Sequence, residues 1–138
     1  MPSVNVKLVE GTMGVATAGQ HAIVVDRSLD KGGTYLGMVG GEILLSAIGA
    51  CLMTTFVGAA RAREIAVTRL EFTVSSVHED GPSRYSSIQI EAVVDADADD
   101  AEIDKLLAIA ERGCTVSNTV ARGAVIGVTR QISEIVPV

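Results

Sequence analysis

The chain has 138 residues, a formal net charge of −6 at pH 7 and only 3% aromatic residues. Its length corresponds to one domain, which we expect to span residues 1–138. The acidic balance argues against nucleic acid, which needs a basic face, and against docking onto anionic lipid. Since tryptophan is absent, the core has to be built from Val, Ile, Leu and Ala.

The first ten residues, MPSVNVKLVE, have no basic stretch followed by an apolar one, so we expect no secretory signal and a cytoplasmic protein. In that compartment thiols stay reduced unless their role is redox. The two cysteines are not in a C-x-x-C pair, and with two scattered histidines they fall short of a zinc site. We therefore expect neither a metal nor a cofactor.

The opening third of the chain predicts strands. Val4, Val6 and Leu8 alternate with polar residues, which is typical of a half-buried strand. The expected elements are strands at 3–10, 15–19 and 21–26, the last two joined by a turn near Gly19, and then a glycine-rich loop over 27–42.

Every residue from Ile43 to Ala60 is uncharged, and Cys51 lies at the centre of this segment. The segment just reaches the length of a membrane span, but Ser46, Gly49 and Gly58 dilute its hydrophobicity and amphipathic strands flank it. A helix that is apolar on every side is equally explained by burial inside a fold or between subunits. We interpret the segment as a core helix.

The second half predicts a hairpin and two helical stretches. The Asp80-Gly81 turn joins strands at 67–77 and 86–96. A helix begins after the N-cap Asp99 and ends near Gly113. A further helical turn after Cys114, capped by Thr115 or Ser117, and a last strand at 124–132 complete the order βββα–ββααβ. The fold class is α+β with a mostly antiparallel sheet.

Each cysteine has a structural and a chemical reading. An unpaired cysteine in the middle of a helix, such as Cys51, is most often a small buried hydrophobe. Cys114 directly follows Gly113 and precedes a helical turn, where free N–H groups would lower its pKa, although a gap-filling role explains the position equally well. Arg27 is the one arginine that precedes the long helix.

Two motifs resemble the OsmC/Ohr superfamily of osmotically induced and organic-hydroperoxide-resistance proteins. These are GEILLSAIGAC, which ends at Cys51, and GCTVSN, which begins at Gly113. The resemblance implies an intertwined α+β homodimer in which long apolar helices meet at the subunit interface. It covers nearly the whole chain, since length and element order agree as well.

The resemblance also implies an activity. Cys51 would attack an organic hydroperoxide and become a sulfenic acid, and Cys114 would condense with it to a disulfide. A dithiol such as a protein-bound lipoyl group would then restore both thiols. No nucleic acid, membrane, metal or cofactor enters this chemistry.

The chain departs from the hydroperoxide-resistance branch just before the long helix. That branch carries Asn-Pro-Glu, whose glutamate holds a catalytic arginine, whereas this chain reads GMVGGE. Gly41 falls where that glutamate would lie, and Glu42 is one residue, about 100° of helix, further on. Arg27 and Glu42 are the candidates for the two charged roles. Glu42 has a second reading, as a carboxylate that stabilises the helix N-terminus.

These departures leave a second function open. The alternative is a non-catalytic dimer that binds an apolar small molecule in its interface cleft, with both thiols structural.

Overall fold

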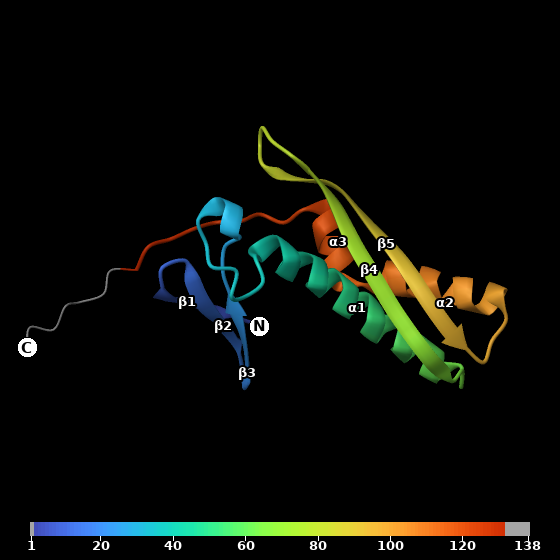
Figure 1. Cartoon of the computed structure of the whole chain (residues 1–138). Coiled ribbons are helices and arrows are strands. Elements are labelled where there is room, and N and C mark those ends of the chain that lie inside the picture. Colours follow the sequence, from blue (N-terminus) through green and yellow to red (C-terminus); the bar gives the residue numbers. More distant parts are fainter. Residues whose placement is uncertain (1, 132–138) are drawn as a thin grey trace, which may run out of the picture.

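The computed structural model describes residues 2–131 of the chain (Figure 1). The described elements, in chain order, are β1 (Asn5–Glu10), β2 (Met13–Ala18), β3 (His21–Val25), the short 3-10 helix η1 (Leu29–Lys31), α1 (Gly40–Ala62), β4 (Val67–Glu79), β5 (Arg84–Ala96), α2 (Asp100–Gly113) and α3 (Thr115–Arg122). The predicted α+β class and the order βββ-α-ββ-αα are confirmed.

The first three strands form an antiparallel sheet in the order β1-β2-β3. Ala18 pairs with His21, so the hairpin turns over Gly19-Gln20 as predicted. Most side chains of β1 and β3 are exposed, and β2 contributes only Gly14 to the buried residues. This sheet therefore has no core of its own within one chain.

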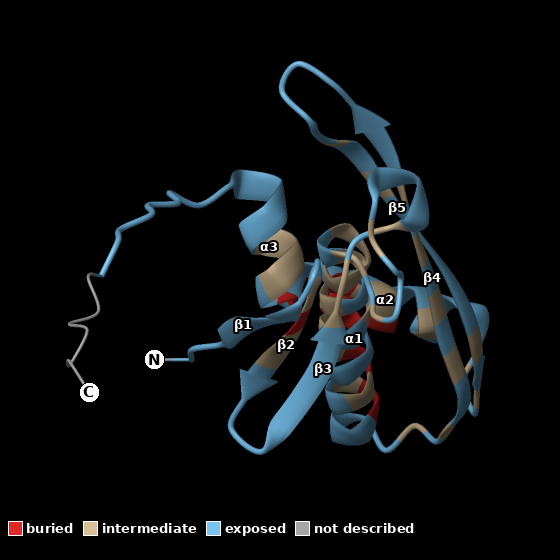
Figure 2. Cartoon of the chain, turned by 60° about the vertical axis from the view of Figure 1, so that its left-hand side comes forward, coloured by how far each residue is buried: buried red, intermediate tan, exposed pale blue. Residues whose placement is uncertain are grey.

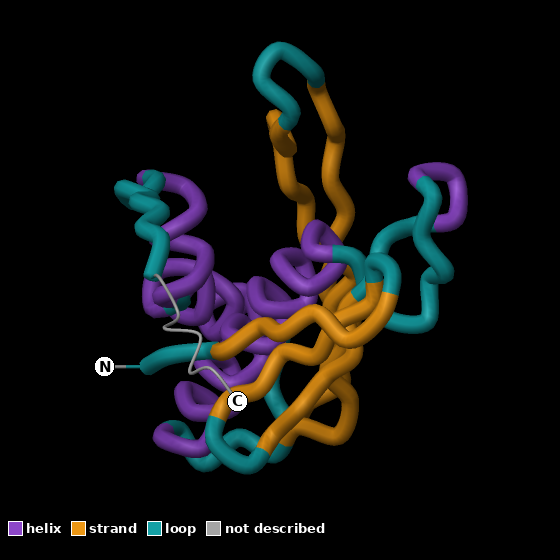
Figure 3. Tube along the Cα trace, turned by 90° about the vertical axis from the view of Figure 1, so that its left-hand side faces the viewer, coloured by secondary structure: helices purple, strands orange, loops and turns teal. Residues whose placement is uncertain are grey.

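The β4–β5 hairpin is a second antiparallel sheet, which lies along α1 (Figure 1). Leu70, Phe72 and Val74 lie on one face of β4, where they are half-buried and pack against the core. When the molecule is turned by 90°, the end of the hairpin that carries the turn between β4 and β5 projects beyond the helices (Figure 3). On β5, Ile90 lies on the same face as Ile88 but is 40% exposed.

The core lies where α1, α2 and the start of α3 meet (Figure 2). The i, i+4 spacing of Ile48, Leu52, Phe56 and Ala60 brings these side chains to one face of α1, and all four are buried. Leu106, Ala110 and Cys114 oppose them. As predicted, α2 begins after the N-cap Asp99, whose carboxylate accepts from the Glu102 N–H at 2.9 Å. The second cysteine is thus a core residue.

The interpretation of α1 as a core helix holds for one of its faces. By length and composition α1 could cross a membrane, and 22% of its most apolar window is buried inside the chain. A core helix passes the same test. The side of α1 that carries Ala50, Thr54 and Gly58 remains exposed within one chain.

The predicted last strand at 124–132 is wrong for residues 124–131, which have no strand partner; Ile132 lies outside the described residues. Val125, Ile126 and Val128 are at least 88% exposed. The alternating apolar pattern exists, but a strand requires a neighbouring edge, and this segment runs on from α3 without pairing with either sheet (Figure 1).

Candidate functional site

The two cysteines meet at the junction of α1, α2 and α3. Cys114 is the N-cap of α3, and its extended backbone (φ −76°, ψ 106°) separates α2 from α3. The Ser117 N–H donates to Cys114 Sγ at 3.3 Å, and the Asn118 side chain donates to the Arg112 carbonyl at 3.0 Å. The sequence placed Cys114 at a helix N-terminus correctly, but the cap is the cysteine itself, not Thr115 or Ser117.

Cys51 reaches this junction from the middle of α1. Its side chain is half-buried and packs against the core cluster that contains Cys114, and both thiols are free. The sulfurs lie close together without a disulfide. Gly113 allows this approach, because a Cβ at that position would lie 3.1 Å from Thr55 Cγ2 on α1.

The surroundings of Cys114 favour its thiolate. Burial raises the pKa of the Cys114 thiol, but the polar neighbours of the sulfur, Ser117 first and then the Cys51 side chain and the Val116 N–H, outweigh it. The net result is a pKa below the ordinary value of a cysteine. The Ser117 hydroxyl is buried and has no hydrogen-bond partner in the described chain.

A largely apolar cavity of about 800 Å³ lies between the β4–β5 hairpin and the helices α1, α2 and α3. Ile48 and Leu52 of α1, Phe72 and Ile88 of the hairpin, and Leu107 of α2 line it. Ser117, which donates to Cys114, belongs to the same wall. Neither cysteine is itself among the residues that line this cavity.

Glu42 stabilises the N-terminus of α1, as its second reading predicted. Oε2 accepts from the Val39 N–H at 3.0 Å, and Oε1 accepts from the Tyr35 hydroxyl at 2.5 Å. These two hydrogen bonds, Tyr35 first, lower the pKa of Glu42. Glu42 precedes Cys51 by about 13 Å of helix rise, so in one chain its carboxylate lies well away from the sulfurs.

Gly41 lies directly against the side chain of Tyr85 of β5. A Cβ at position 41 would overlap the Tyr85 hydroxyl. In this chain Tyr85 thus fills the space that a side chain at position 41 would need. The sequence revealed the glycine but gave no signal for the tyrosine, which comes from a distant strand.

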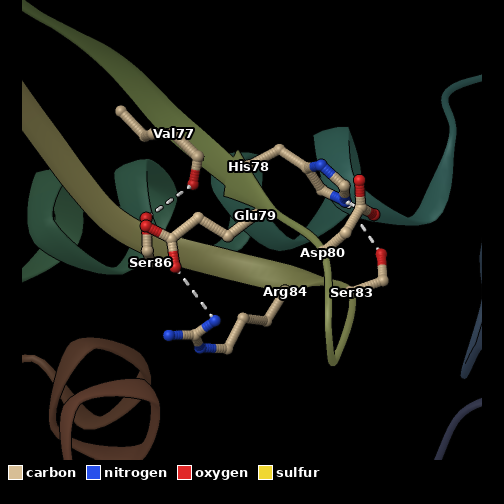
Figure 4. A network of polar contacts seen from close by, with 7 residues as sticks. All are labelled: Val77, His78, Glu79, Asp80, Ser83, Arg84 and Ser86. Carbon is tan, nitrogen blue, oxygen red and sulfur yellow. Dashed lines mark hydrogen bonds and ion pairs between the residues drawn. The ribbon is translucent and has the colours of Figure 1, made fainter.

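Arg27 lines a second cavity, of about 620 Å³, at the N-terminal end of α1. Lys31, His78 and Arg84 share this cavity, and neither cysteine lines it. Figure 4 shows the hairpin end beside it, where Arg84 pairs with Glu79 at 3.1 Å and His78 contacts Ser83 at 2.8 Å. The catalytic role predicted for Arg27 stays a prediction, since within one chain it shares this cavity with Asp26, Lys31 and Arg84 and not with a thiol.

Of the four predicted site residues, the structure brings Cys51 and Cys114 together, and it gathers Arg27 and Glu42 separately around the start of α1. The residues that sequence reasoning missed are Tyr35, Tyr85 and the donor role of Ser117. Among the described residues, no group of three or more His, Cys, Asp or Glu side chains could hold a metal ion.

A two-cysteine α+β protein with a long apolar helix is the class that this fold and site define. A scan of protein families matches residues 31–129 to the OsmC-like protein family. The chain belongs to the OsmC-like family. A search of curated proteins found no match.

Solved structures share the fold at low sequence identity. An OsmC-like protein from Mycoplasma pneumoniae matches with a TM-score of 0.79 and 22% identity, covering 88% of this chain and 87% of that one. The organic hydroperoxide resistance protein OhrB of Bacillus subtilis matches with a TM-score of 0.60 and 18% identity, covering 87% and 90%. A Legionella pneumophila structure, described as an organic hydroperoxide resistance protein OsmC, gives 0.61 and 16%, covering 86% and 88%.

Proposed function

We propose that this protein is a cysteine-based peroxidase that reduces organic hydroperoxides in oxidative-stress defence. Cys51 attacks the peroxide, and Cys114 resolves the sulfenic acid into a disulfide. The observation that carries the proposal is the meeting of two free thiols from distant parts of the chain. The hydroperoxide-resistance proteins among the structural neighbours support it.

The exposure of the two thiols supports this division of roles. Cys51 is half-buried and Cys114 is fully buried, so a peroxide meets Cys51 first. The apolar wall of the adjacent cavity suits the hydrocarbon part of an organic hydroperoxide better than hydrogen peroxide. The disulfide product is reduced by a dithiol, such as a lipoyl group on a partner protein, and the reduced resting state suits the cytoplasm.

The working form in this proposal is a homodimer. Val6 and Leu8 on β1 are 64% and 68% exposed, and Val125 and Ile126 are exposed almost completely. Apolar surface of this extent on a monomer marks an interaction site. The outer side of α1 adds small residues, which let a second helix approach closely. A second copy of the chain is the occupant that the family resemblance implies.

The proposal is tested by counting free thiols after one equivalent of cumene hydroperoxide. We expect both thiols to be lost to an intramolecular disulfide in the wild type. In Cys51→Ser, Cys114 should stay reduced. In Cys114→Ser, a sulfenic acid should form on Cys51 and react with dimedone. Unchanged thiols in the wild type would overturn the peroxidase function.

The cavity favours one alternative, a dimer that binds an apolar small molecule without chemistry. Its volume of about 800 Å³ is in the range of small-molecule sites, and most of its lining is apolar. Calorimetric titration with a medium-chain fatty acid would detect such binding. Binding together with unreactive thiols would establish the alternative.

A further inference from the structure

Two cavities of different character lie on either side of Tyr85. The first, of about 800 Å³, has a largely apolar wall and is here called the apolar cavity. The second, of about 620 Å³, is here called the cationic cavity, because its wall includes the side chains of Arg27, Lys31 and Arg84. The carboxylate of Asp26 also lines it, but that group already accepts hydrogen bonds from four donors of the same chain. The apolar cavity therefore suits a hydrocarbon chain, and the cationic cavity suits an anionic group.

The boundary between the two cavities is formed by the residues that line both of them, which are Tyr85, Ile88 and Val120. Of these, Tyr85 reaches α1, where its hydroxyl lies so close to Gly41 that a Cβ there would overlap it. The ring of His78 on β4 meets the Tyr85 ring edge-on, with centroids 6.5 Å apart and an angle of 79° between the planes. Tyr85 thus bridges the hairpin and α1. All of these residues belong to one chain, so the boundary does not depend on a second copy.

We propose that Tyr85 is a specificity-determining residue, whose ring closes the apolar cavity towards the cationic cavity. A hydrocarbon chain bound in the apolar cavity ends at this ring, so a carboxylate carried by that chain does not reach the cations beyond it. The protein then selects a ligand by its apolar part and gains no affinity from a negative charge. This inference goes beyond the proposed function, because it applies equally to the hydrocarbon part of a hydroperoxide and to an unreactive ligand.

Gly41 is the partner that makes the closure possible. A side chain at this position would need the space that the Tyr85 ring fills, so the ring would have to move. Removing the ring should have the opposite effect and join the two cavities. A carboxylate could then receive hydrogen bonds from cationic side chains, and one such bond is worth about ten-fold or more in affinity.

The test is calorimetric titration of the wild type and Tyr85→Ala with decanoate and with decanol, two probes that share a chain length and differ in charge. We expect the wild type to bind decanoate no more tightly than decanol. In Tyr85→Ala the preference should shift towards decanoate by about ten-fold or more. A wild type that already prefers decanoate ten-fold would overturn the inference, as would an unchanged preference in folded Tyr85→Ala.

Three further variants separate the ring from other effects. Tyr85→Phe keeps the ring and should keep the wild-type preference, whereas a shift as large as that of Tyr85→Ala would overturn the closure by the ring. Ile90→Ala is the matched control, because Ile90 lines the apolar cavity and not the cationic one. It should leave the preference unchanged, and an equal shift there would also overturn the inference. If circular dichroism shows that Tyr85→Ala is unfolded, Tyr85→Leu replaces it, since leucine is too short to reach Gly41.

The last measurement asks whether the cations cause the shift. Adding Lys31→Gln and Arg84→Gln to Tyr85→Ala should remove most of the gain for decanoate, and salt should weaken that gain in Tyr85→Ala itself. A gain that persists in both experiments would overturn the inference. If neither the wild type nor Tyr85→Ala binds either probe, the inference fails, while the thiol counts that test the peroxidase function are unaffected. Unreactive thiols, conversely, would leave the binding result standing.

Discussion

The Tyr35 hydroxyl donates to Glu42 Oε1 at 2.5 Å and joins the loop before α1 to the first turn of that helix. The same bond raises the pKa of Tyr35 and lowers that of Glu42. Removing the hydroxyl with Tyr35→Phe should therefore raise the pKa of the Glu42 carboxyl, which carbon-detected NMR titration would measure.

This variant also separates the two readings of Glu42. A carboxylate that only holds the helix N-terminus predicts that Tyr35→Phe lowers thermal stability and changes the rate of Cys51 oxidation less than two-fold. A ten-fold slower oxidation in a folded Tyr35→Phe protein would instead support the charged role that the family resemblance implies.

Asp26 organises the loop between β3 and α1. Its carboxylate accepts from the Thr12 hydroxyl at 2.6 Å, from the Thr34 hydroxyl, and from the N–H groups of Arg27 at 2.7 Å and Leu36 at 3.2 Å. These hydrogen bonds, those of Thr12 and Thr34 first, hold the pKa of Asp26 well below its ordinary value.

A lowered folded-state pKa sets the direction of the acid response. The stabilisation is complete above the unfolded-state pKa of about 4 and is lost as the pH falls towards the folded-state value. Asp26→Asn should therefore be less stable than the wild type in urea unfolding at pH 7, and the difference should shrink below about pH 4. A difference that stays constant from pH 7 to pH 3 would contradict this account.

Gly41 and Tyr85 compete for the same space at the start of α1. Gly41→Ala improves helix propensity by up to about 1 kcal/mol, but the new methyl group has to displace the tyrosine ring, for which overpacking costs of roughly 1–3 kcal/mol are typical. We expect Gly41→Ala to destabilise the wild type and to stabilise Tyr85→Ala. A double-mutant cycle from urea unfolding measures this change of sign, and a stabilising effect with Tyr85 present would contradict it.

Local sequence patterns predicted most of the helices and strands. The remaining features depend on contacts between residues that are far apart in the sequence. The uncharged segment Ile43–Ala60, the cap at Asp99 and the Asp80-Gly81 turn are local signals, and each element formed where they predicted. The segment 124–131 does not form a strand, because a strand needs a neighbouring edge to pair with and the local sequence does not determine whether one is there.

The candidate site shows the same division. Cys51 and Cys114 were predictable as a pair because each belongs to a recognisable motif. The helical turn predicted after Cys114 also indicated that backbone N–H groups would lie near its sulfur. The contacts of Tyr35 and Tyr85 were not predictable, since they depend on how a loop and a distant strand fold back onto α1.

The outer side of α1 tests the proposed dimer. Ala50, Thr54 and Gly58 recur every four residues on the exposed side, and a Cβ added at Gly58 would meet no atom of the same chain within 4 Å. In an isolated chain, Gly58→Leu should therefore be neutral or stabilise the helix by up to about 1 kcal/mol. Against a closely packed second helix, the same side chain would clash.

We expect Gly58→Leu to weaken the dimer at least ten-fold, or about 1.4 kcal/mol, in sedimentation equilibrium, while circular dichroism shows unchanged helix content. Ala108→Leu, at an exposed position of α2, is the matched control and should leave the dimer intact. If Gly58→Leu associates as tightly as the wild type, the second copy does not pack on this side of α1. A monomeric wild type would exclude the dimer altogether, and the exposed apolar residues of β1 and of segment 124–131 would then need another partner.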